Sequence, residues 1–297
     1  MRAYVIGNAA IDENFRVERL PGEGESILAG KGSVELGGKG ANQAVVLARA
    51  GLPTTLIAGI GSDTRAERVR GWLAAEPLEA RLLPIAGAST DLSIILADGE
   101  GANVIVTTVD CARALTADAV LPDLAAAAPG DLMVLQGNLG LSTTRALIAE
   151  ARARAMRVVF NPSPVRDAFA DLLPQVDTLF LNQHEAGVLS GREGAEAVRA
   201  LLRAGPSTVV LTLGREGALL GTAGGVRPVP AVAVAATDST GAGDTFQSVA
   251  LVSAARRGTG IDAAALRDAA RAAAITVTRR GTLSAFPTQA ELEALLA

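Results

Sequence analysis

Thr237-Asp-Ser-Thr-Gly-Ala-Gly-Asp-Thr-Phe246 is the stretch that decides how this chain folds and what chemistry it can perform. It follows an apolar run over residues 231–236 and precedes a long helical pattern over residues 247–256, so its glycines shape the start of a helix. Gly241 and Gly243 allow the backbone to approach a ligand closely, while the unpaired N–H groups and the dipole of a first helical turn attract an anion such as phosphate. The stretch therefore predicts a phosphate site at a helix N-terminus.

Asp244 is an unexpected residue in such a turn. A carboxylate beside an anion site repels the phosphate, so its presence is best explained if it accepts a proton from an attacking hydroxyl group. The alternative is that Asp244 only caps the helix, which Asp does often. From this stretch alone, the two interpretations are equally open.

The rest of the chain alternates strand and helix patterns, and we expect no fixed-period repeat. Repeated β-α-β order requires parallel strands with helices on both faces, which predicts an α/β, doubly wound parallel sheet over a single domain, 1–297. Ligands of such sheets gather at the carboxyl ends of the strands. The expected strands cover residues 4–6, 54–58, 132–135, 158–160, 178–181 and 209–212.

Two segments, at about residues 13–37 and 90–108, interrupt this alternation with β-prone patches and turn residues. In the second segment, residues 92–96 and 103–107 flank Asp98-Gly-Glu-Gly101, a strong hairpin signal because Asp-Gly supplies the positive φ angles of a tight turn. We expect the two insertions to pair into a small β lid that excludes water from the site, with Gly37 and Gly38 as its hinge.

Composition and charge exclude several classes of protein. The 297 residues include 27 Lys and Arg against 31 Asp and Glu, a net charge of −4, which argues against a nucleic-acid partner. Cys111 is the one cysteine and His184 the one histidine, so we expect no internal disulfide, no zinc cluster and a reducing, cytoplasmic location. We expect His184 to face solvent. Neither a secretory stretch nor an 18-residue apolar run is present, so no membrane segment is expected.

A second glycine-rich segment, Gly37-Gly-Lys-Gly-Ala-Asn-Gln-Ala44, precedes another helical pattern. A P-loop would need glycine where Ser33 stands, and Gly59-Ile-Gly61 lacks the third glycine of a dinucleotide motif at Thr64. Instead, this segment and residues 238–246 resemble the N-terminal and C-terminal signatures of the ribokinase (PfkB) family of carbohydrate kinases, in the expected order. The resemblance spans nearly the whole chain, with further similar segments at residues 161–164, 182–185, 211–217 and 277–281.

The resemblance implies a ribokinase-like fold and an ATP-dependent sugar kinase that transfers the γ-phosphate to a hydroxymethyl group, with ribose as the first choice of sugar. Asp244 would be the catalytic base, and the N–H groups of Gly241, Ala242, Gly243 and Asp244 would form the anion hole. Neutralising the phosphates of ATP also requires Mg²⁺. In the family, the pair corresponding to Asn182 and Glu185 orders this ion largely through water; the alternative is a helix capping box, which their spacing fits equally.

Further site residues follow from the same resemblance. Thr212, Gly214 and Gly217, with Asn182 and Gly243, would contact the nucleotide, although residues 212–217 also fit an ordinary strand-to-hairpin connection. The family's potassium site would use the carboxylate of Asp238. Backbone carbonyls would come from Thr240, Thr276, Arg279 and Gly281. Some members carry a hydroxyl residue four positions after this glycine, where this chain has Ala285.

For the sugar, the resemblance implies Asp12, Gly38, Lys39 and Asn42 beside Asp244, since carboxylate and amide groups suit paired hydroxyls. The chain departs from ribokinases twice: Ala10 replaces an Asn, and the Glu expected after residues 132–135 is absent, leaving Gln136 or Asn138 to take its contact.

The sequence leaves three further functions open. A nucleoside kinase would hold its base between aromatic side chains, but Phe15 is the one aromatic residue of the two insertions. A fructose-type kinase is the second, and a sugar- or nucleotide-binding regulator without catalysis is the third; an intact Asp244 favours an enzyme. We also expect a homodimer formed through the lids, since a small exposed sheet with an apolar face needs a partner.

Overall fold

The apolar runs predicted as strands form the centre of a nine-stranded sheet in the computed structural model, which describes residues 1–98 and 103–297. All six expected strands are present, each extended by one to three residues. In spatial order the strands are β13 (Gly225–Val229), β12 (Ala218–Thr222), β11 (Thr208–Thr212), β10 (Thr178–Asn182), β9 (Arg157–Asn161), β8 (Leu132–Gln136), β1 (Ala3–Asn8), β4 (Thr54–Ile60) and β5 (Glu79–Pro84).

The strands from β11 to β5 run parallel, which confirms the doubly wound α/β class. At one edge the chain adds β12 and β13 as an antiparallel hairpin, which agrees with the interpretation of residues 212–217 as a strand-to-hairpin connection, although no strand was predicted at either position. From β1 the chain first builds outward through β4 and β5, then returns to β8 on the other side of β1. Ligands of such sheets bind beyond the carboxyl ends of the strands at this reversal, so the ends of β1 and β8 mark the expected site.

Each strand of this sheet supplies side chains to two separate cores because successive residues point to opposite faces. In β8, Leu132 and Val134 pack in one core, whereas Met133 and Leu135 pack in the other. The first core is covered by α1 (Lys39–Arg49), α2 (Thr64–Ala74), α8 (Ala242–Arg256), α9 (Ala263–Val277) and α10 (Gln289–Leu296). The second is covered by α3 (Asp110–Ala114), α4 (Ala117–Val120), α5 (Leu141–Ala153), α6 (Gln183–Ser190) and α7 (Gly194–Arg203), with 3-10 segments η1 (Leu121–Leu124) and η2 (Asp167–Gln175).

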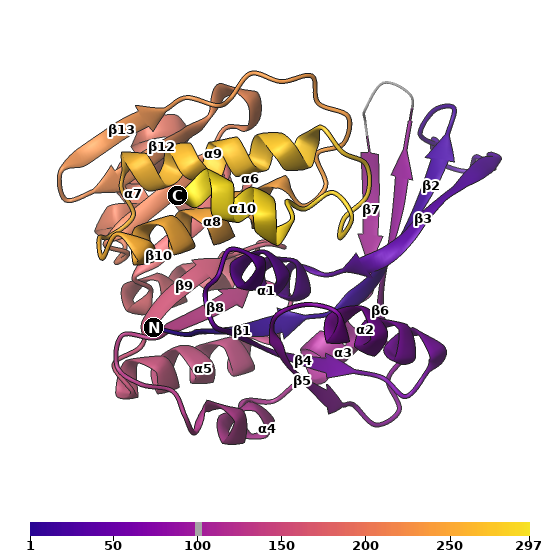
Figure 1. Ribbon diagram of the computed structural model, residues 1–297, viewed down its shortest axis with the longest axis horizontal. Helices are drawn as coiled ribbons and strands as arrows, with labels where there is room; N and C mark the ends of the chain where they lie inside the picture. The colour runs from indigo at the N-terminus through magenta and orange to yellow at the C-terminus, as the bar shows by residue number, and fades with distance from the viewer. Residues whose placement is uncertain (99–102) are drawn as a thin grey trace.

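A four-stranded sheet stands beside this layered body, and we call it the lid (Figure 1). Its order is β3-β2-β6-β7, so strands from the two insertions pair with each other. The strands are β2 (Ala10–Val17), β3 (Ala29–Gly37), β6 (Asp91–Ala97) and β7 (Asn103–Thr107), while most of the turn predicted at 98–101 lies outside the described residues. Because β2 already begins at Ala10, Asp12 belongs to the lid rather than to the loop after β1.

Within residues 1–98 and 103–297, none of the helices combines the length and the apolar character that crossing a membrane demands.

Candidate active site

The start of α8 has the geometry expected of an anion site. Gly241 is the residue that precedes the helix, with a φ of 73°, and an added Cβ there would lie 2.5 Å from the Phe286 ring. Among the residues that the structure describes, no side chain caps this helix. The N–H of Ala242 reaches the carbonyl of Ser239 at 3.3 Å, and the next first-turn N–H groups, of Gly243 and Asp244, are those that a helix leaves without an internal acceptor. These two groups are therefore available to an anion.

Asp244 is the third residue of α8 and points toward α1. Its Oδ2 accepts a hydrogen bond from Asn42 Nδ2 at 3.0 Å, and its Oδ1 accepts one from Gln43 Nε2 at 2.9 Å. The interpretation of Asp244 as a helix cap is therefore wrong, because the carboxylate binds a different helix. Each carboxylate oxygen has a second lone pair, so Asp244 can still accept a hydrogen bond from a substrate hydroxyl.

Gln43 is the centre of a buried amide cluster. Its Nε2 donates to Asp244, and its Oε1 accepts from Gln136 Nε2 at 2.8 Å and from Gln247 Nε2 at 3.0 Å. Gln43, Gln136 and Gln247 are all at most 2% exposed. Because the Gln43 oxygen accepts from two donors, the side-chain amide can adopt only the orientation in which its NH₂ group faces Asp244.

Asp12 lies at the base of the lid, buried over Gly37. An added Cβ on Gly37 would lie 2.0 Å from the Asp12 carboxylate, so this position requires glycine. Burial raises the pKa of Asp12 to about 6, opposed by hydrogen bonding to the hydroxyl of Thr282 and assisted by the charges of Asp244 and Glu35. Asp12 and Asp244 are thus brought into the same electrostatic neighbourhood from strands and helices far apart in the sequence.

The glycines of the first signature let α1 start against the crossing from β1 to β2. Gly38 has a φ of 88°, and an added Cβ on Gly40 would lie 2.7 Å from the carbonyl oxygen of Asn8. Close backbone packing therefore accounts for the glycines of this segment. Lys39, the first residue of α1, is partly buried at the same point.

Gln136 and Asn138 lie at the carboxyl end of β8, beside the end of β1. The Gln136 amide donates to Gln43, and its own Oε1 faces Gly7, where an added Cβ would lie 1.9 Å away. Asn138 is 4% exposed. Among the described residues, the side-chain oxygens of Asn138, Asn42 and Gln136 are buried acceptors without a hydrogen-bond partner.

The residues expected at the nucleotide lie at the ends of β10 and β11. Asn182 and Thr212 are directly paired in the parallel register. Asn182 Oδ1 accepts from the N–H of Glu185, and Glu185 Oε2 accepts from the N–H of Asn182, both at 2.9 Å, so the capping-box interpretation is confirmed. Gly214 has open space where a Cβ would lie, and His184, as expected, is exposed.

Gly217 has a structural reason to be glycine. Its φ is 96°, and an added Cβ would lie 2.1 Å from the carbonyl oxygen of Val229 in β13. This contact fits the interpretation of residues 212–217 as a strand-to-hairpin connection.

Two loops expected at a monovalent cation meet through Asp238. Its Oδ1 accepts from the N–H of Thr240 at 2.9 Å, and its Oδ2 accepts from the N–H of Gly281 at 3.2 Å. A cavity of about 410 Å³ lies between these loops and the lid, and Asp238, Gly281 and Glu35 are among its lining residues. Across the described part of the chain, no group of three or more His, Cys, Asp and Glu side chains is arranged to hold a metal ion.

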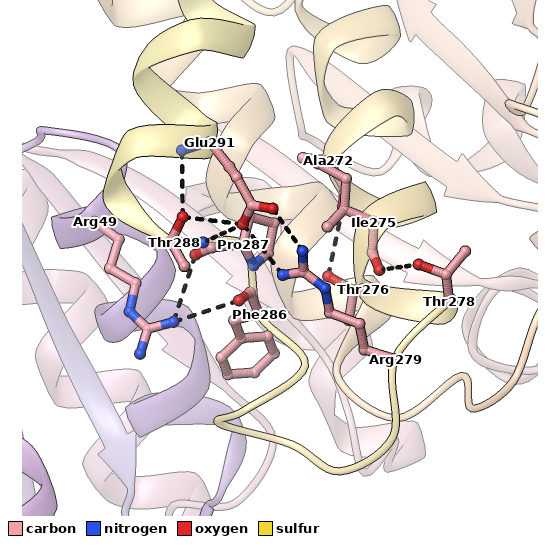
Figure 2. Close-up of polar contacts among 10 residues, drawn as sticks. All are labelled: Arg49, Ala272, Ile275, Thr276, Thr278, Arg279, Phe286, Pro287, Thr288 and Glu291. Atoms are coloured by element: carbon pink, nitrogen blue, oxygen red, sulfur yellow. Dashed lines mark hydrogen bonds and ion pairs between the residues drawn. The ribbon is translucent and has the colours of Figure 1, made fainter.

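Thr276 and Arg279, the other two residues expected at this cation, use their side chains in contacts elsewhere in the protein. Thr276 is fully buried, with its Oγ1 3.0 Å from Thr245 Oγ1. The guanidinium of Arg279 points away toward Glu291, as Figure 2 shows. For Arg279, only the backbone carbonyl remains as a ligand.

Comparison with known proteins identifies the family. The profile described as pfkB family carbohydrate kinase matches residues 2–289. The chain belongs to the pfkB family of carbohydrate kinases. As in that family, its activity is the transfer of a phosphoryl group from ATP to an alcohol group of a sugar.

Individual relatives of this pfkB-family kinase carry the same fold. It is 31% identical over 294 residues to a ribokinase from Haemophilus influenzae, covering 97% of this chain and 95% of the relative. The structure of ribokinase from Giardia lamblia superimposes with a TM-score of 0.90 at 25% identity, over 99% of this chain and 98% of that one. A ribokinase from Cryptococcus neoformans var. grubii serotype A, solved in complex with ADP, gives 0.85 at 27% identity over 99% of both chains.

Sequence reasoning missed four residues around the kinase site: Gln43, Gln247, Thr282 and Glu35. Gln43 and Gln247 were detectable, because uncharged polar side chains inside apolar helical patterns are buried and need partners. Glu35 and Thr282 meet across a sequence separation of 247 residues, for which a single sequence holds no signal.

Proposed function

We propose that this kinase phosphorylates the hydroxymethyl group of ribose, using ATP as the phosphoryl donor. The observation that carries the proposal is the carboxylate of Asp244, held by Asn42 and Gln43 beside the free N–H groups of the first turn of α8. The similarity to chains named ribokinase supports ribose over different sugars.

In the proposed mechanism Asp244 takes the proton of the attacking sugar hydroxyl. At the same time the hydroxyl oxygen forms a bond to the γ-phosphorus, and the bond between the γ-phosphorus and the ADP oxygen breaks. The anion hole for the charge on the transferring group is assigned to Gly241, Ala242, Gly243 and Asp244, where the N–H groups of Gly243 and Asp244 lack an acceptor within the helix. Positioning and charge stabilisation supply most of the rate in such transfers. The amide cluster around Gln43 keeps the donor bond to Asp244 in place and so orients the carboxylate that receives the proton.

Sugar recognition is assigned to Asp12, Asn42 and Asn138, with Gly38 and Lys39 at the start of α1. Ribose hydroxyls donate hydrogen bonds, and the buried side-chain oxygens of Asn42 and Asn138 are acceptors without a partner among the described residues. Asn138 or Gln136 takes the contact of the family's Glu, because the side-chain oxygen of each is a buried acceptor without a partner among the described residues.

The nucleotide is assigned to the ends of β10 and β11, through Asn182, Thr212, Gly214 and Gly217, and to Gly243 in α8. Mg²⁺ accompanying ATP would be held by Glu185 and Asn182, largely through water, because hard oxygen donors suit this ion. When bound, it neutralises phosphate charge. The capping box leaves Glu185 Oε1 free for this second role, since only Oε2 is used by Asn182.

A potassium ion is proposed beside Asp238, with backbone carbonyls of Thr240, Thr276, Arg279 and Gly281. The support is that Asp238 already joins the two loops that carry these carbonyls. Activity in potassium chloride, compared with tetramethylammonium chloride at equal ionic strength, tests this assignment; equal rates would remove it.

A homodimer through the lids is proposed from the exposed apolar side chains of Ile94, Val104 and Val106, which are 39%, 43% and 61% exposed. These residues lie on the opposite side of the lid from Asp12, because Ile94 pairs with Val106 whereas Ser93 pairs with Asp12. The cytoplasm, where ATP and reduced thiols coexist, stays the predicted location.

The test of the proposed function is sugar-dependent ADP release, measured against ribose, 2-deoxyribose, fructose and nucleosides. We expect ribose to give the highest kcat/KM. A preference for a nucleoside or for fructose would replace ribose with that class, and no ADP release with any acceptor would favour a binding regulator without catalysis.

Asp244→Ala is the matched variant for this assay. We expect kcat to fall by about three orders of magnitude or more, with ATP affinity nearly unchanged, because the base is lost and the backbone N–H groups remain. Asp118→Ala, an exposed residue of α4, is the control. An Asp244→Ala enzyme that retains most of its turnover would remove Asp244 from the mechanism.

A further inference from the structure

Two carboxylates face each other across the lid strands β2 and β3. Asp12 and Glu35 are direct partners in the antiparallel register, so their side chains lie on the same face of the sheet. Like charges in this arrangement are destabilising, and the Glu35 charge is among the causes that raise the pKa of Asp12. Within the lid, hydrogen bonding to Ser93 of β6 favours the charged form of Asp12, and further donors come from outside the lid.

The donors come from the loop that follows α9. Glu35 Oε2 accepts from the N–H of Thr282 at 3.1 Å and from the N–H of Ser284 at 3.0 Å, and the Ser284 hydroxyl lies 3.0 Å from both Glu35 oxygens. Thr282 also donates its hydroxyl to Asp12 Oδ2 at 2.9 Å. Thr282 is fully buried and bridges the two carboxylates. We call Glu35, Asp12, Thr282 and Ser284 the clasp.

Gly281 makes room for the clasp. Its φ is 96°, and an added Cβ would lie 2.4 Å from Glu35 Oε1. A larger residue at this point would push the carboxylate away. The backbone of the loop is therefore shaped to receive a lid carboxylate.

The loop is fixed to the body on its far side. Figure 2 shows Arg279 reaching Glu291 in α10, and Arg49 of α1 reaching the carbonyls of Phe286 and Pro287. Since both ends of the loop are held by the layered body, its middle is a fixed point to which the lid attaches.

We propose that Glu35 and Thr282 are positioning residues for the acceptor sugar: together they attach the base of the lid to the body and hold the Asp12 carboxylate in its binding orientation. The inference rests on the proposed role of Asp12 in sugar binding. Neither residue needs to touch the sugar or ATP, so the clasp acts on sugar affinity and leaves the γ-phosphate site and Asp244 as they are.

The clasp predicts a specific kinetic pattern. Glu35→Ala removes the acceptor of three donors, and Thr282→Val removes the hydroxyl that holds Asp12 at nearly constant volume. We expect each to raise the KM for ribose about tenfold and to change the KM for ATP by less than about twofold, with a smaller effect on kcat than on the ribose KM. Thr282→Ser keeps the hydroxyl and should restore the wild-type ribose KM.

The control is Glu18→Gln, which removes an exposed lid charge outside the clasp and should leave the ribose KM unchanged. Hydrogen exchange of the segment 279–286 supplies a readout that needs no substrate. In Glu35→Ala we expect the amides of Thr282 and Ser284 to exchange at least about tenfold faster than in the wild type, because both donate to Glu35.

The outcomes separate this inference from the proposed function. A wild-type enzyme that phosphorylates ribose, with Glu35→Ala and Thr282→Val both within twofold of its ribose KM, would overturn the clasp alone. Equal losses in Thr282→Ser and Thr282→Val would also overturn it, because packing rather than the hydroxyl would then be responsible. If the wild type phosphorylates none of the acceptors, the proposed function fails, and unchanged exchange in Glu35→Ala would overturn the clasp independently.

Discussion

Gln43 links a buried polar cluster to the proposed catalytic base. Its NH₂ group donates to Asp244, and its oxygen accepts from Gln136 and Gln247, so the same amide joins the buried cluster and holds the carboxylate of Asp244. Buried polar groups that lose a partner cost about 1 to 3 kcal/mol each. The two roles can therefore be separated by substitutions that keep one side of the amide.

Gln43→Leu and Gln43→Glu make this separation. Gln43→Leu leaves three side chains without their hydrogen-bond partner, and we expect the free energy of unfolding to fall by about 3 kcal/mol or more and kcat by about 10- to 100-fold. Gln43→Glu keeps an acceptor for Gln136 and Gln247 but faces Asp244 with a second carboxylate. We expect repulsion between the two buried carboxylates to add to the stability loss in urea unfolding, with a kcat loss at least as large as that of Gln43→Leu. Equal kcat values in wild type and Gln43→Glu would show that the donor bond to Asp244 has no catalytic role.

Asp12 predicts a pH dependence with a definite sign. Because burial raises its pKa from 3.8 to about 6, the folded state binds more protons than the unfolded state between these pH values. Stability therefore falls as pH rises from about 4 to 6, and the ionised carboxylate costs about 2 to 3 kcal/mol above that window. The proposed role of Asp12 in sugar binding needs the same carboxylate ionised, so kcat/KM for ribose should fall below about pH 6.

Asp12→Asn removes the titration. In urea unfolding we expect this variant to gain stability over the wild type at pH 8 and to lose that advantage near pH 4, while its ribose KM rises. Asp91, whose pKa burial also raises to about 6, is unchanged in both proteins and cancels in the comparison. A stability difference that is the same at pH 4 and pH 8 would contradict the assignment.

At the residue scale, the sequence alone pointed to the groups that are proposed to carry the chemistry but not to the side chains that hold them. Asp244 and Gly241 could be predicted because glycines at a helix start indicate an anion site, and a carboxylate beside that site indicates a proton acceptor. Glu35 and Thr282 could not, because their significance arises only when a lid strand and a loop near the C-terminus come together.

At the scale of elements, the first turn of α8 distinguishes two kinds of glycine. An added Cβ on Gly241 would meet Phe286 at 2.5 Å, whereas one on Gly243 would meet no atom within 4 Å. The first glycine is required by packing, and the second keeps the surface above the N–H groups open. This contrast was invisible in the sequence, where both belong to one motif.

Gly243→Ala and Gly241→Ala should therefore fail in different ways. In Gly243→Ala we expect unchanged or slightly higher stability, since Ala favours a helix over Gly by up to about 1 kcal/mol, and an ATP KM raised about tenfold by the methyl group above the anion hole. In Gly241→Ala we expect stability to fall by about 1 to 3 kcal/mol from the positive φ and the Phe286 clash. Thermal unfolding and ATP titrations measure both. A wild-type ATP KM in Gly243→Ala would place the phosphate elsewhere.

Strand prediction succeeded where burial is continuous and failed at the sheet edges. The central parallel strands are apolar on both faces, so a continuous apolar run such as residues 132–135 is recognisable as a strand from the sequence. At the edges, β5 alternates polar and apolar residues and ends in Pro84, and β13 contains Pro228, so both read as irregular chain.

At the scale of the whole molecule, the lid has one face turned to the site and one that faces outward. The outward apolar face of β6 and β7 includes Ile94, Val104 and Val106, and β7 is an edge strand of its sheet. Exposed edges of this kind invite pairing with another chain. A second copy of the chain offers the same apolar surface, which favours a symmetric dimer.

Val106→Glu tests this dimer. We expect light scattering to give twice the chain mass for the wild type at micromolar concentration and the single chain mass for the variant, because a charge at the centre of an apolar interface is costly to desolvate. Val188→Glu introduces the same charge at an apolar position of α6 that is 38% exposed, away from the lid, and should remain dimeric. A monomeric wild type would refute the lid interface, and dissociation of both variants would place the interface outside the lid. Because the lid also carries Asp12 on its opposite face, a monomeric Val106→Glu enzyme should bind ribose more weakly than the dimer, with the same ATP affinity.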